Sequence, residues 1–270
     1  MRKVDLPELK EILLSLMDEI HEICEKRNLR YYLAGGTLIG AVRHNGFIPW
    51  DDDIDIYMPR PDYDEFMQIY PNEGKNVLYE HSNNENYKYP FAKLCKKNTL
   101  LIERAADSGV DMGIYLDIFP LDALGNSEKE AKRLMKKLLP YVNLNLSLLV
   151  EQWRDNVSFV KNFAIWNLHN VALMAGGHKK LLKKIDNIIR TYDYESSSLV
   201  GEFIDEIQYK RITDKKLYNA RILHDFEGRQ YYIPLGYDKI LTDFYGDYMT
   251  PPPPEKQVLT HGFEAFVLED

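Results

Sequence analysis

Two short motifs near the N-terminus hold the residue types best suited to chemistry. Gly-Gly-Thr at 35–37 is followed by Asp-Asp-Asp-Ile-Asp at 51–55. Residues 53–58 alternate polar and apolar side chains, as a strand with one wet face does, so Asp53 and Asp55 are predicted to share a face. Two carboxylates this close repel each other unless a cation or water screens them. Hard oxygen ligands on a rigid strand suit Mg²⁺ or Mn²⁺.

The glycines add a second half to this predicted site. Adjacent glycines let the backbone approach a ligand closely, and their amide groups can face a phosphate. The alternative is an ordinary turn followed by a solvated acidic edge, which explains most isolated Asp-x-Asp pairs. Four aspartates within the five positions 51–55, with Gly-Gly-Thr upstream, favour a metal and phosphate site instead.

The elements around these motifs can be predicted from hydrophobic periodicity. Apolar residues at helical spacing predict an amphipathic helix over 7–28, and a short strand over 31–34 leads into the Gly-Gly-Thr turn. A short helix is expected over 38–44. The strand over 53–58 is followed by a helix that Asp62 could cap.

The rest of the chain divides into a strand-rich and a helical part. Residues 77–120 are predicted to be rich in strands, with Pro120 ending the last of them. Residues 128–192 are predicted to be helical, with breaks near Pro140 and at the glycines 176–177. After these helices the pattern becomes mixed and aromatic.

Length and composition exclude several classes of protein. The 270 residues, 45% of them hydrophobic and 28% charged, suit a globular fold with a substantial core. The two cysteines, Cys24 and Cys95, provide no disulfide framework or zinc spacing, which favours a reduced, cytoplasmic protein. We find no signal peptide and no apolar run long enough to span a membrane. The net charge of -8 argues against nucleic acid as a partner.

This net charge is unevenly distributed. Residues 131–190 hold eleven Lys and Arg against three acidic residues, a net charge of +8, so the remainder carries -16. The basic segment could meet anionic lipid at the inner face of the cell membrane. The alternative is that its lysines simply solvate the outer faces of ordinary helices.

One long motif and three shorter ones identify a family resemblance. Residues 34–56, Ala-Gly-Gly-Thr-Leu-Ile-Gly-Ala-Val-Arg-His-Asn-Gly-Phe-Ile-Pro-Trp-Asp-Asp-Asp-Ile-Asp-Ile, resemble the signature of the LicD family. These are bacterial phosphocholine transferases related to the fukutin-type ribitol-phosphate transferases. Leu-Asp-Ile-Phe-Pro-Leu-Asp at 116–122, Phe-Glu-Gly-Arg at 226–229, and Tyr-Gly-Asp-Tyr at 245–248 with the prolines 251–252 resemble further LicD motifs in the expected order.

The resemblance covers about residues 10 to 265 and implies an α+β fold. Its core would be nucleotidyltransferase-like (polymerase-beta-like), with a small mixed β-sheet flanked by helices. We expect a catalytic core over 1–125, a basic helical insert or subdomain over 126–195, and a mixed C-terminal segment over 196–270 that packs back on the core. Sixteen residues separate Gly36 from Asp53, more than in the shortest pattern of the wider superfamily.

The resemblance also implies a set of site residues. The metal ligands would be Asp53, Asp55 and Asp117, and these three residues with Asp51 would be catalytic. Asp117 lies between Leu116 and Ile118, a charge in an apolar strand that calls for a partner. The substrate-binding residues would be Gly35, Gly36, Thr37, Arg43, His44, Trp50 and Arg229.

Structural alternatives accompany most of these assignments. Asp117 could be a plain edge-strand residue, and Asp51 and Asp52 could cap a turn rather than accept a proton or bind a metal-bound water. Arg43 and His44 could end a surface helix, Arg229 could form a structural ion pair with Glu227 or elsewhere, and Trp50 could belong to the core rather than stack on a base or a quaternary ammonium. Lys93 is expected to be exposed, and His261 to be a surface residue.

The implied activity is metal-dependent transfer of a phospho-alcohol group. The donor would be CDP-choline or another CDP-alcohol, the acceptor a hydroxyl of a cell-surface glycan, lipopolysaccharide or teichoic-acid precursor, and the product CMP. The head group stays open among choline, ribitol, glycerol and ethanolamine. Two alternatives are a nucleotidyltransferase that moves a nucleoside monophosphate and an inactive binding protein of the same fold. A lipid-linked acceptor would place the enzyme in the cytoplasm, peripherally at the inner face of the membrane.

Overall fold

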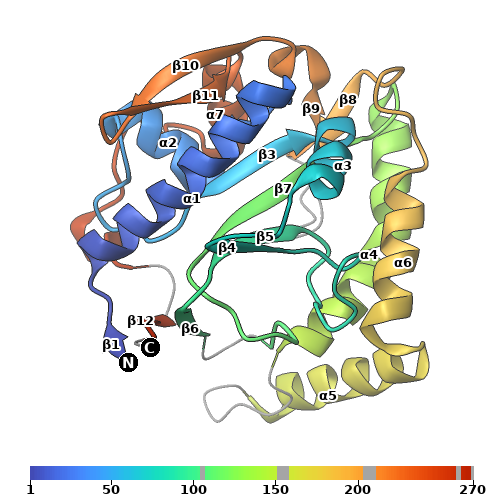
Figure 1. Cartoon of the computed structure of the whole chain (residues 1–270). Coiled ribbons are helices and arrows are strands. Elements are labelled where there is room, and N and C mark those ends of the chain that lie inside the picture. The colour runs from blue at the N-terminus through green and yellow to red at the C-terminus, as the bar shows by residue number, and fades with distance from the viewer. Residues whose placement is uncertain (104–106, 151–157, 203–210, 260–262, 269–270) are drawn as a thin grey trace.

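A computed structural model describes residues 1–103, 107–150, 158–202, 211–259 and 263–268. Within these residues a mixed sheet lies at the centre, and helices pack on both of its faces (Figure 1). The α-helices are α1 (Leu6–Arg27), α2 (Gly35–His44), α3 (Arg60–Ile69), α4 (Glu128–Leu149), α5 (Phe159–Met174), α6 (Gly177–Ile189) and α7 (Tyr237–Tyr245), and the short 3-10 helices are η2 (Lys215–Tyr218) and η3 (Pro254–Lys256).

The central sheet has the strand order β2-β3-β7-β5-β4, with β8 joined to β7 and β9 joined to β8. Its members are β2 (Tyr32–Leu33), β3 (Asp55–Pro59), β4 (Asn76–Tyr79), β5 (Ala92–Lys96), β7 (Tyr115–Ala123), β8 (Leu199–Gly201) and β9 (Thr213–Asp214). Only the β3–β7 pair of this sheet is parallel. The expected α+β class with a mixed sheet is therefore confirmed.

Two smaller antiparallel sheets complete the described strands. The hairpin of β10 (Arg221–Phe226) and β11 (Arg229–Pro234) forms one. The other has the order β1-β12-β6, from β1 (Arg2–Lys3), β6 (Thr99–Glu103) and β12 (Phe263–Val267). This second sheet brings the N-terminal and C-terminal ends side by side.

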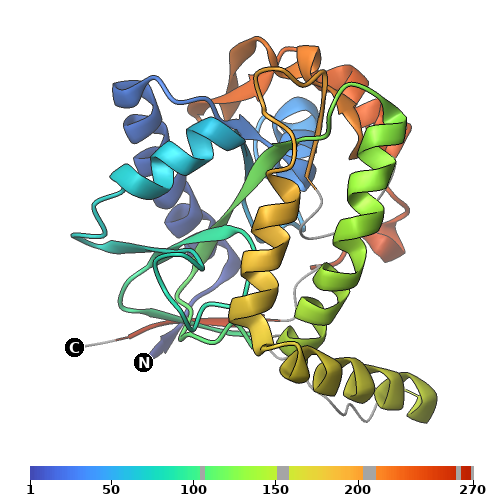
Figure 2. The ribbon, with the colours of Figure 1, turned by 90° about the vertical axis from the view of Figure 1, so that its right-hand side faces the viewer.

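Alternation along β3 and β7 gives the sheet a separate core on each face. Ile56 and Met58 belong to a cluster that packs α1 and α3 on one face, whereas Tyr57 and Phe119 belong to a cluster that packs α4 and α6 on the other. A strand turns successive side chains to opposite faces, and that is why one sequence serves both clusters. Figure 2 shows the second layer, with α4 and α6 side by side and α5 projecting from their lower ends.

Several predicted elements are confirmed and others need correction. The helix predicted over 7–28 is α1, and Asn28 caps its end in the left-handed region. The predicted strand-rich part holds β4, β5, β6 and β7. Asp62 does not cap α3; it lies in the first turn, and its carboxylate accepts hydrogen bonds from the backbone and guanidinium of Arg30.

Two prolines predicted to end elements lie inside them. β7 continues past Pro120 to Ala123. On the side of β7 opposite β3, β5 stops pairing at Ile118 and β8 starts at Asp122, so the missing amide of Pro120 deprives no strand there of a partner. α4 runs unbroken through Pro140, whose side chain is exposed, so the carbonyl that loses its intrahelical partner is on the wet side of the helix.

No helix within the described residues combines the length and apolar character needed to cross a membrane. The division of the chain at 125 and 195 into a catalytic core, a helical segment and a C-terminal segment stays a prediction.

Candidate active site

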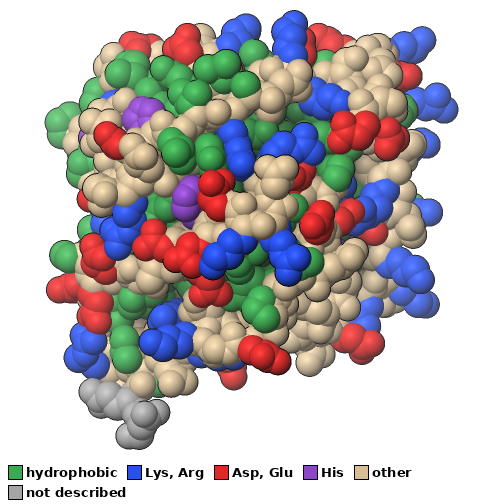
Figure 3. Space-filling model, turned by 45° about the horizontal axis from the view of Figure 1, so that its top comes forward, with side chains coloured by type: hydrophobic (Ala, Val, Ile, Leu, Met, Phe, Trp, Pro, Cys, Tyr) green, Lys and Arg blue, Asp and Glu red, His purple; other side chains and the backbone are tan. Residues whose placement is uncertain are grey.

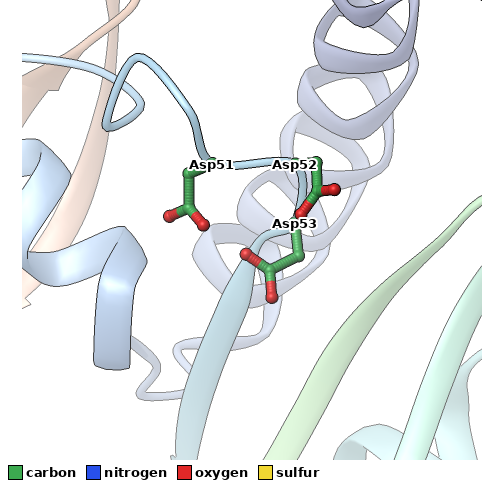
Figure 4. Close-up of side chains that lie close together, drawn as sticks. All are labelled: Asp51, Asp52 and Asp53. Atoms are coloured by element: carbon green, nitrogen blue, oxygen red, sulfur yellow. The ribbon is translucent and has the colours of Figure 1, made fainter. Parts of the chain in front are cut away.

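Three aspartates meet where the loop after α2 enters β3. One carboxylate oxygen from each of Asp51, Asp52 and Asp53 lies within 4.8 Å of the others, and Figure 4 shows the three side chains around this point. Asp52 is buried, and Asp51 and Asp53 are partly buried. β3 begins only at Asp55, so Asp53 lies in the loop and not in the strand as predicted. The loop itself, rather than strand alternation, places Asp53.

Asp55 and Asp117 lie opposite each other on the parallel strands β3 and β7. The amide of Asp117 donates to the carbonyl of Ile54 at 3.0 Å, which fixes the register at this point. β7 lies between β3 and β5, so the alternative of Asp117 as an edge-strand residue is wrong. The two strands thus place two of the three predicted metal ligands next to each other.

The Gly-Gly-Thr motif forms the first turn of α2 and not a turn before the helix. Gly35 has φ +52°, in the left-handed region that glycine tolerates. A Cβ on Gly35 would lie 3.2 Å from Oδ2 of Asp55, and one on Gly36 would lie 3.0 Å from Oδ2 of Asp51. The absence of side chains lets the positive end of α2 approach both carboxylates.

Thr37 links the helix to the strand. Its buried hydroxyl accepts a hydrogen bond from the amide of Asp55 at 3.0 Å, and the amide of Ala34 donates to the carbonyl of Asp55 at the same distance. Thr37 therefore positions the start of β3 rather than presenting its hydroxyl to solvent. Backbone amides at a helix N-terminus are a ready-made site for a phosphate, so this end of α2 can hold an anion beside the carboxylates.

Lys93 is buried, contrary to its prediction as an exposed lysine. Its side chain is 4% exposed, and Nζ donates to Oδ1 of Asp117 at 2.6 Å. The same Nζ lies 3.5 Å from the centre of the Tyr115 ring and 4.9 Å from that of Tyr89. A charge inside an apolar strand run needs a partner, and that rule, applied to Lys93 as it was to Asp117, would have found the pair.

A second cation that the sequence analysis missed lies near the aspartate loop. Nζ of Lys10 on α1 is 3.4 Å from the carbonyl oxygens of Ile48 and Pro49 and 4.8 Å from the centre of the Phe47 ring. Burial lowers the pKa of this ammonium, while Glu227, Asp51 and Asp52 act in the opposite direction. Nothing in the helical pattern of α1 distinguishes Lys10 from a solvated lysine.

Arg43 and His44 end α2, at the opposite end from the glycines. Gly35 and Arg43 are eight positions apart in the helix, roughly 12 Å along the axis. Nη1 of Arg43 donates to the carbonyl of Tyr248 at 2.7 Å, and its Nε to Nδ1 of His44 at 3.4 Å. Partial burial and the neighbouring guanidinium lower the pKa of His44. The structure thus joins these residues to the Tyr-Gly-Asp-Tyr motif.

The Phe-Glu-Gly-Arg motif forms the turn of the β10–β11 hairpin. Oε1 of Glu227 accepts from the amide of Phe47 at 3.0 Å, and the amide of Glu227 donates to the carbonyl of Asn45 at 2.9 Å. A Cβ on Gly46 would lie 2.2 Å from Oε1 of Glu227, so a larger residue here would push this side chain out of its present position. The motif therefore holds the loop between α2 and the aspartates.

Two predicted substrate-binding residues make structural contacts. Nε of Arg229 lies 3.1 Å from Oδ2 of Asp18, and its Nη2 lies 3.3 Å from Oε2 of Glu11, both on α1. Arg229 therefore forms an ion pair, with these residues rather than with Glu227. Trp50 is partly buried and packs against the cluster on the α1 face. His261 lies outside the described residues.

The donor set fits a hard divalent cation. The carboxylates of Asp51, Asp52 and Asp53 are close enough together to share an ion, and Asp55 and Asp117 lie opposite each other on the two adjacent strands. Carboxylate oxygens are the ligand type that Mg²⁺ and Mn²⁺ prefer. A small cavity of about 20 Å³ adjoins these carboxylates, lined by Asp52, Asp53 and Asp117 with Tyr115, Leu9, Leu13, Leu101 and Ile114. The structure therefore brings Asp51, Asp53, Asp55, Asp117 and the glycine end of α2 to one region, while Arg43, His44 and Arg229 are bound elsewhere.

Comparison with known proteins finds relatives that share this region. A family model described as "LicD/FKTN/FKRP, nucleotidyltransferase domain" matches residues 28–138, which include the glycines and every carboxylate of the site. The lipopolysaccharide cholinephosphotransferase LicD of Haemophilus influenzae is 33% identical over 99% of this chain and 100% of its own length. The human ribitol 5-phosphate transferase FKRP is 38% identical over 58 residues, 22% of this chain and 12% of its own length.

Proposed function

The chain belongs to the LicD family and is a transferase, and we propose that it moves a phosphocholine group from CDP-choline to a hydroxyl of lipopolysaccharide. The oxygen of the acceptor hydroxyl forms the new bond to phosphorus, the bond between that phosphorus and the CMP oxygen breaks, and CMP leaves. The same chemistry would serve another cell-surface glycan or a teichoic-acid precursor as acceptor. The main support for this proposal is that the aspartate loop, the Asp55–Asp117 pair and the N-terminus of α2 lie in one region of the structure.

Each part of the site has a task in this reaction. The first-turn amides of α2, at Gly35, Gly36 and Thr37, bind the donor phosphates, because a helix N-terminus favours anions. Asp51 accepts the proton of the acceptor hydroxyl. Lys93 holds the Asp117 carboxylate in place through its 2.6 Å contact.

Asp53, Asp55 and Asp117 would hold Mg²⁺, with Mn²⁺ as a substitute. When bound, the ion supplies positive charge to the transferring phosphoryl group. Support comes from their oxygen donors, from the closeness of Asp53 to Asp51 and Asp52, and from the register that sets Asp55 opposite Asp117. A divalent cation relieves the repulsion between carboxylates that lie this close together. We further propose that the sheet around these residues is a polymerase-beta-like nucleotidyltransferase core.

A second donor is supported by the similarity to the human ribitol 5-phosphate transferase. That similarity extends over only 22% of the chain, so it bears on the shared chemistry more than on the head group. The full-length similarity to a cholinephosphotransferase favours choline. Glycerol and ethanolamine phosphates are the remaining head groups to compare.

The test measures products with purified protein, Mg²⁺, lipopolysaccharide and one nucleotide donor at a time. We expect CMP and phosphocholine-bearing lipopolysaccharide from CDP-choline, and little turnover of CDP-ribitol, CDP-glycerol or CDP-ethanolamine. Turnover of another CDP-alcohol alone would change the head group. Pyrophosphate released from a nucleoside triphosphate, without CMP from any CDP-alcohol, would replace the proposal with nucleotidyl transfer.

The matched variants are Asp53→Asn/Asp55→Asn and Asp225→Asn. The double variant removes two predicted ligands, and we expect its turnover to fall by at least about a thousandfold. Asp225 is an exposed carboxylate of the β10–β11 hairpin, so its variant should keep full activity. Unchanged turnover in a correctly folded double variant would remove the assignment of the site.

A further inference from the structure

Helix α5 presents apolar side chains to solvent. Its exposed hydrophobic residues are Phe159, Val160, Phe163, Trp166, Leu168, Val171, Leu173 and Met174. Val160 is 76% exposed and Met174 80%. Figures 1 and 2 show α5 projecting beyond the ends of α4 and α6. An exposed apolar surface of this kind on a folded domain marks an interaction site.

Helix α5 is apolar on most of its sides, and its buried positions are not its most apolar ones. Its buried side holds the amide of Asn162 and the small residue Ala172, and Nδ1 of His169 lies 3.1 Å from the carbonyl oxygen of Ser147 on α4. A helix that serves only its own core turns its apolar stripe inward and its polar stripe outward. In α5 the apolar residues are therefore left for a surface outside this chain.

Two polar side chains of α5 donate hydrogen bonds to backbone carbonyls of the same helix. The side-chain amide of Asn167 donates to the carbonyl of Phe163 at 2.7 Å, and that of Asn170 donates to the carbonyl of Trp166 at 2.8 Å. The rings of Phe159, Phe163 and Trp166 stack in sequence, with centres 6.3 and 6.0 Å apart. Together these contacts leave α5 with an apolar surface, formed by the exposed residues named above, in which two side-chain amides already have hydrogen-bond partners. We call this surface the apolar strip.

The charged residues of α5 and of the first two turns of α6 are all lysines. Residues 158–184 contain five lysines and no acidic residue: Lys161, Lys179, Lys180, Lys183 and Lys184. All five lysines are exposed residues of α5 or α6. Lys179 pairs with the exposed Glu85. Lys161 lies on α5 itself, and Lys180, Lys183 and Lys184 lie on α6, the helix that follows it. An apolar strip with a cationic border complements an anionic lipid surface.

We propose that α5 lies in the surface of an anionic lipid bilayer. Its exposed apolar residues enter the boundary between headgroups and acyl chains, and the lysines of α5 and α6 meet the headgroup phosphates. The helix is 16 residues long, roughly 24 Å, so it suits a position in the plane of the membrane rather than across it. A second copy of the chain fits less well, because docking two α5 helices would bring like charges together.

The test is flotation with vesicles of phosphatidylcholine alone or with an equal part of phosphatidylglycerol, which needs neither donor nor acceptor. We expect binding to the anionic vesicles that weakens as salt is raised. Val160→Glu/Met174→Glu should lower the partition coefficient by at least about tenfold. The control Leu223→Glu/Leu235→Glu places the same charges on exposed apolar positions of other elements, and it should bind as the unaltered protein does.

The emission of Trp166 provides a second measurement. Insertion should shift Trp emission to shorter wavelength in the unaltered protein, and Trp166→Phe should remove that shift while leaving flotation intact. Failure to bind anionic vesicles at low salt, or equal binding by the Val160→Glu/Met174→Glu variant, would overturn the proposal. So would a dimer in solution without vesicles that this variant converts to a monomer, since a second copy would then cover α5.

Discussion

Lys93 and Asp117 form a mostly buried ion pair in the central sheet. The side chain of Lys93 is 4% exposed and that of Asp117 is 15% exposed, so both have lost most of their contact with water. Such a pair recovers its desolvation cost only while both partners are present. Removing one partner is therefore far more harmful than removing both.

Lys93→Met should lower the free energy of unfolding by about 3 kcal/mol, because Asp117 would remain in a mostly apolar setting without that ammonium. Lys93→Met/Asp117→Leu should recover most of this loss. Urea denaturation followed by circular dichroism measures both variants, with the double variant as the control for packing. A Lys93→Met protein as stable as the unaltered one would show that Asp117 does not depend on Lys93.

The closeness of the Asp51, Asp52 and Asp53 carboxylates predicts how Mg²⁺ affects the stability of the protein. Charges about 5 Å apart repel by about 1 kcal/mol in a largely aqueous setting, so Asp53→Asn should stabilise the protein by that amount in the presence of EDTA. Mg²⁺ should raise the thermal midpoint of the unaltered protein and have a much smaller effect on Asp53→Asn, since only a ligand of the folded state stabilises it.

Thermal denaturation with and without Mg²⁺ measures this difference, and Asp225→Asn serves as the matched control. An equal response of all three proteins to Mg²⁺ would mean that the ion does not bind at the aspartate loop.

Helix α2 packs closely against the loop that follows it. Gly40 faces the turn that follows the helix, and a Cβ there would lie 2.5 Å from the carbonyl oxygen of Gly46 and 3.1 Å from the amide of Ile48. Both are backbone atoms, so no side chain can rotate away. The approach fixes the loop that leads to the aspartates.

Gly40→Ala sets helix propensity against this contact. Alanine favours a helix interior over glycine by about 1 kcal/mol, but the backbone clash should cost about 1–3 kcal/mol. We expect a net loss of stability and, because the loop shifts, a higher KM for the CDP-alcohol. Chemical denaturation and donor kinetics check the two effects, and a more stable variant with unchanged KM would contradict the packing argument.

The elements also show what sequence could and could not predict. Helix α1 and the strands of the 77–120 part were predictable because period and apolar spacing are local. The start of α2 at Gly35 was not, since no side chain caps it and glycine is poor in helices. Similarly, Pro120 is tolerated because it falls between the end of the β5 pairing and the start of the β8 pairing, and Pro140 because it faces solvent.

In the candidate site, too, local patterns were predictable and contacts between distant parts of the chain were not. The aspartate and glycine motifs were found from residue type and spacing, and the Asp55–Asp117 pairing matches the proposed third ligand. The contacts that Lys10 and Glu227 make with the loop were missed, because each residue reaches the loop from a distant part of the chain. Arg43 and Arg229 look like phosphate ligands in sequence, and only the fold shows the carbonyl and the carboxylates that they contact.

Over the whole molecule, charge is segregated between two parts. Figure 3 shows Lys and Arg side chains gathered along the edge that lies over α4 and α6. The segment 131–190 carries +8, and the remainder, with the aspartate loop, carries -16. The net charge of -8 thus describes neither part, and an acidic protein can offer a basic face to lipid while holding its carboxylates for a metal.

The two thiols report on the stability of the entire fold. Cys24 and Cys95 are both fully buried, Cys24 within the cluster on the α1 face. Burial raises the pKa of Cys24 to about 12, so its thiolate is scarce at neutral pH. Neither thiol should react with Ellman's reagent in the native protein, whereas both should react in urea.

In the native protein, the labelling rate of Cys24 should follow the free energy of unfolding, because its helix packs on the central sheet. Leu16→Ala, in the same cluster, should raise its labelling rate, and an exposed substitution such as Asp225→Asn should not. Rapid native labelling of Cys24 that neither variant alters would mean that α1 opens on its own, and that the sheet and α1 are not one cooperative unit.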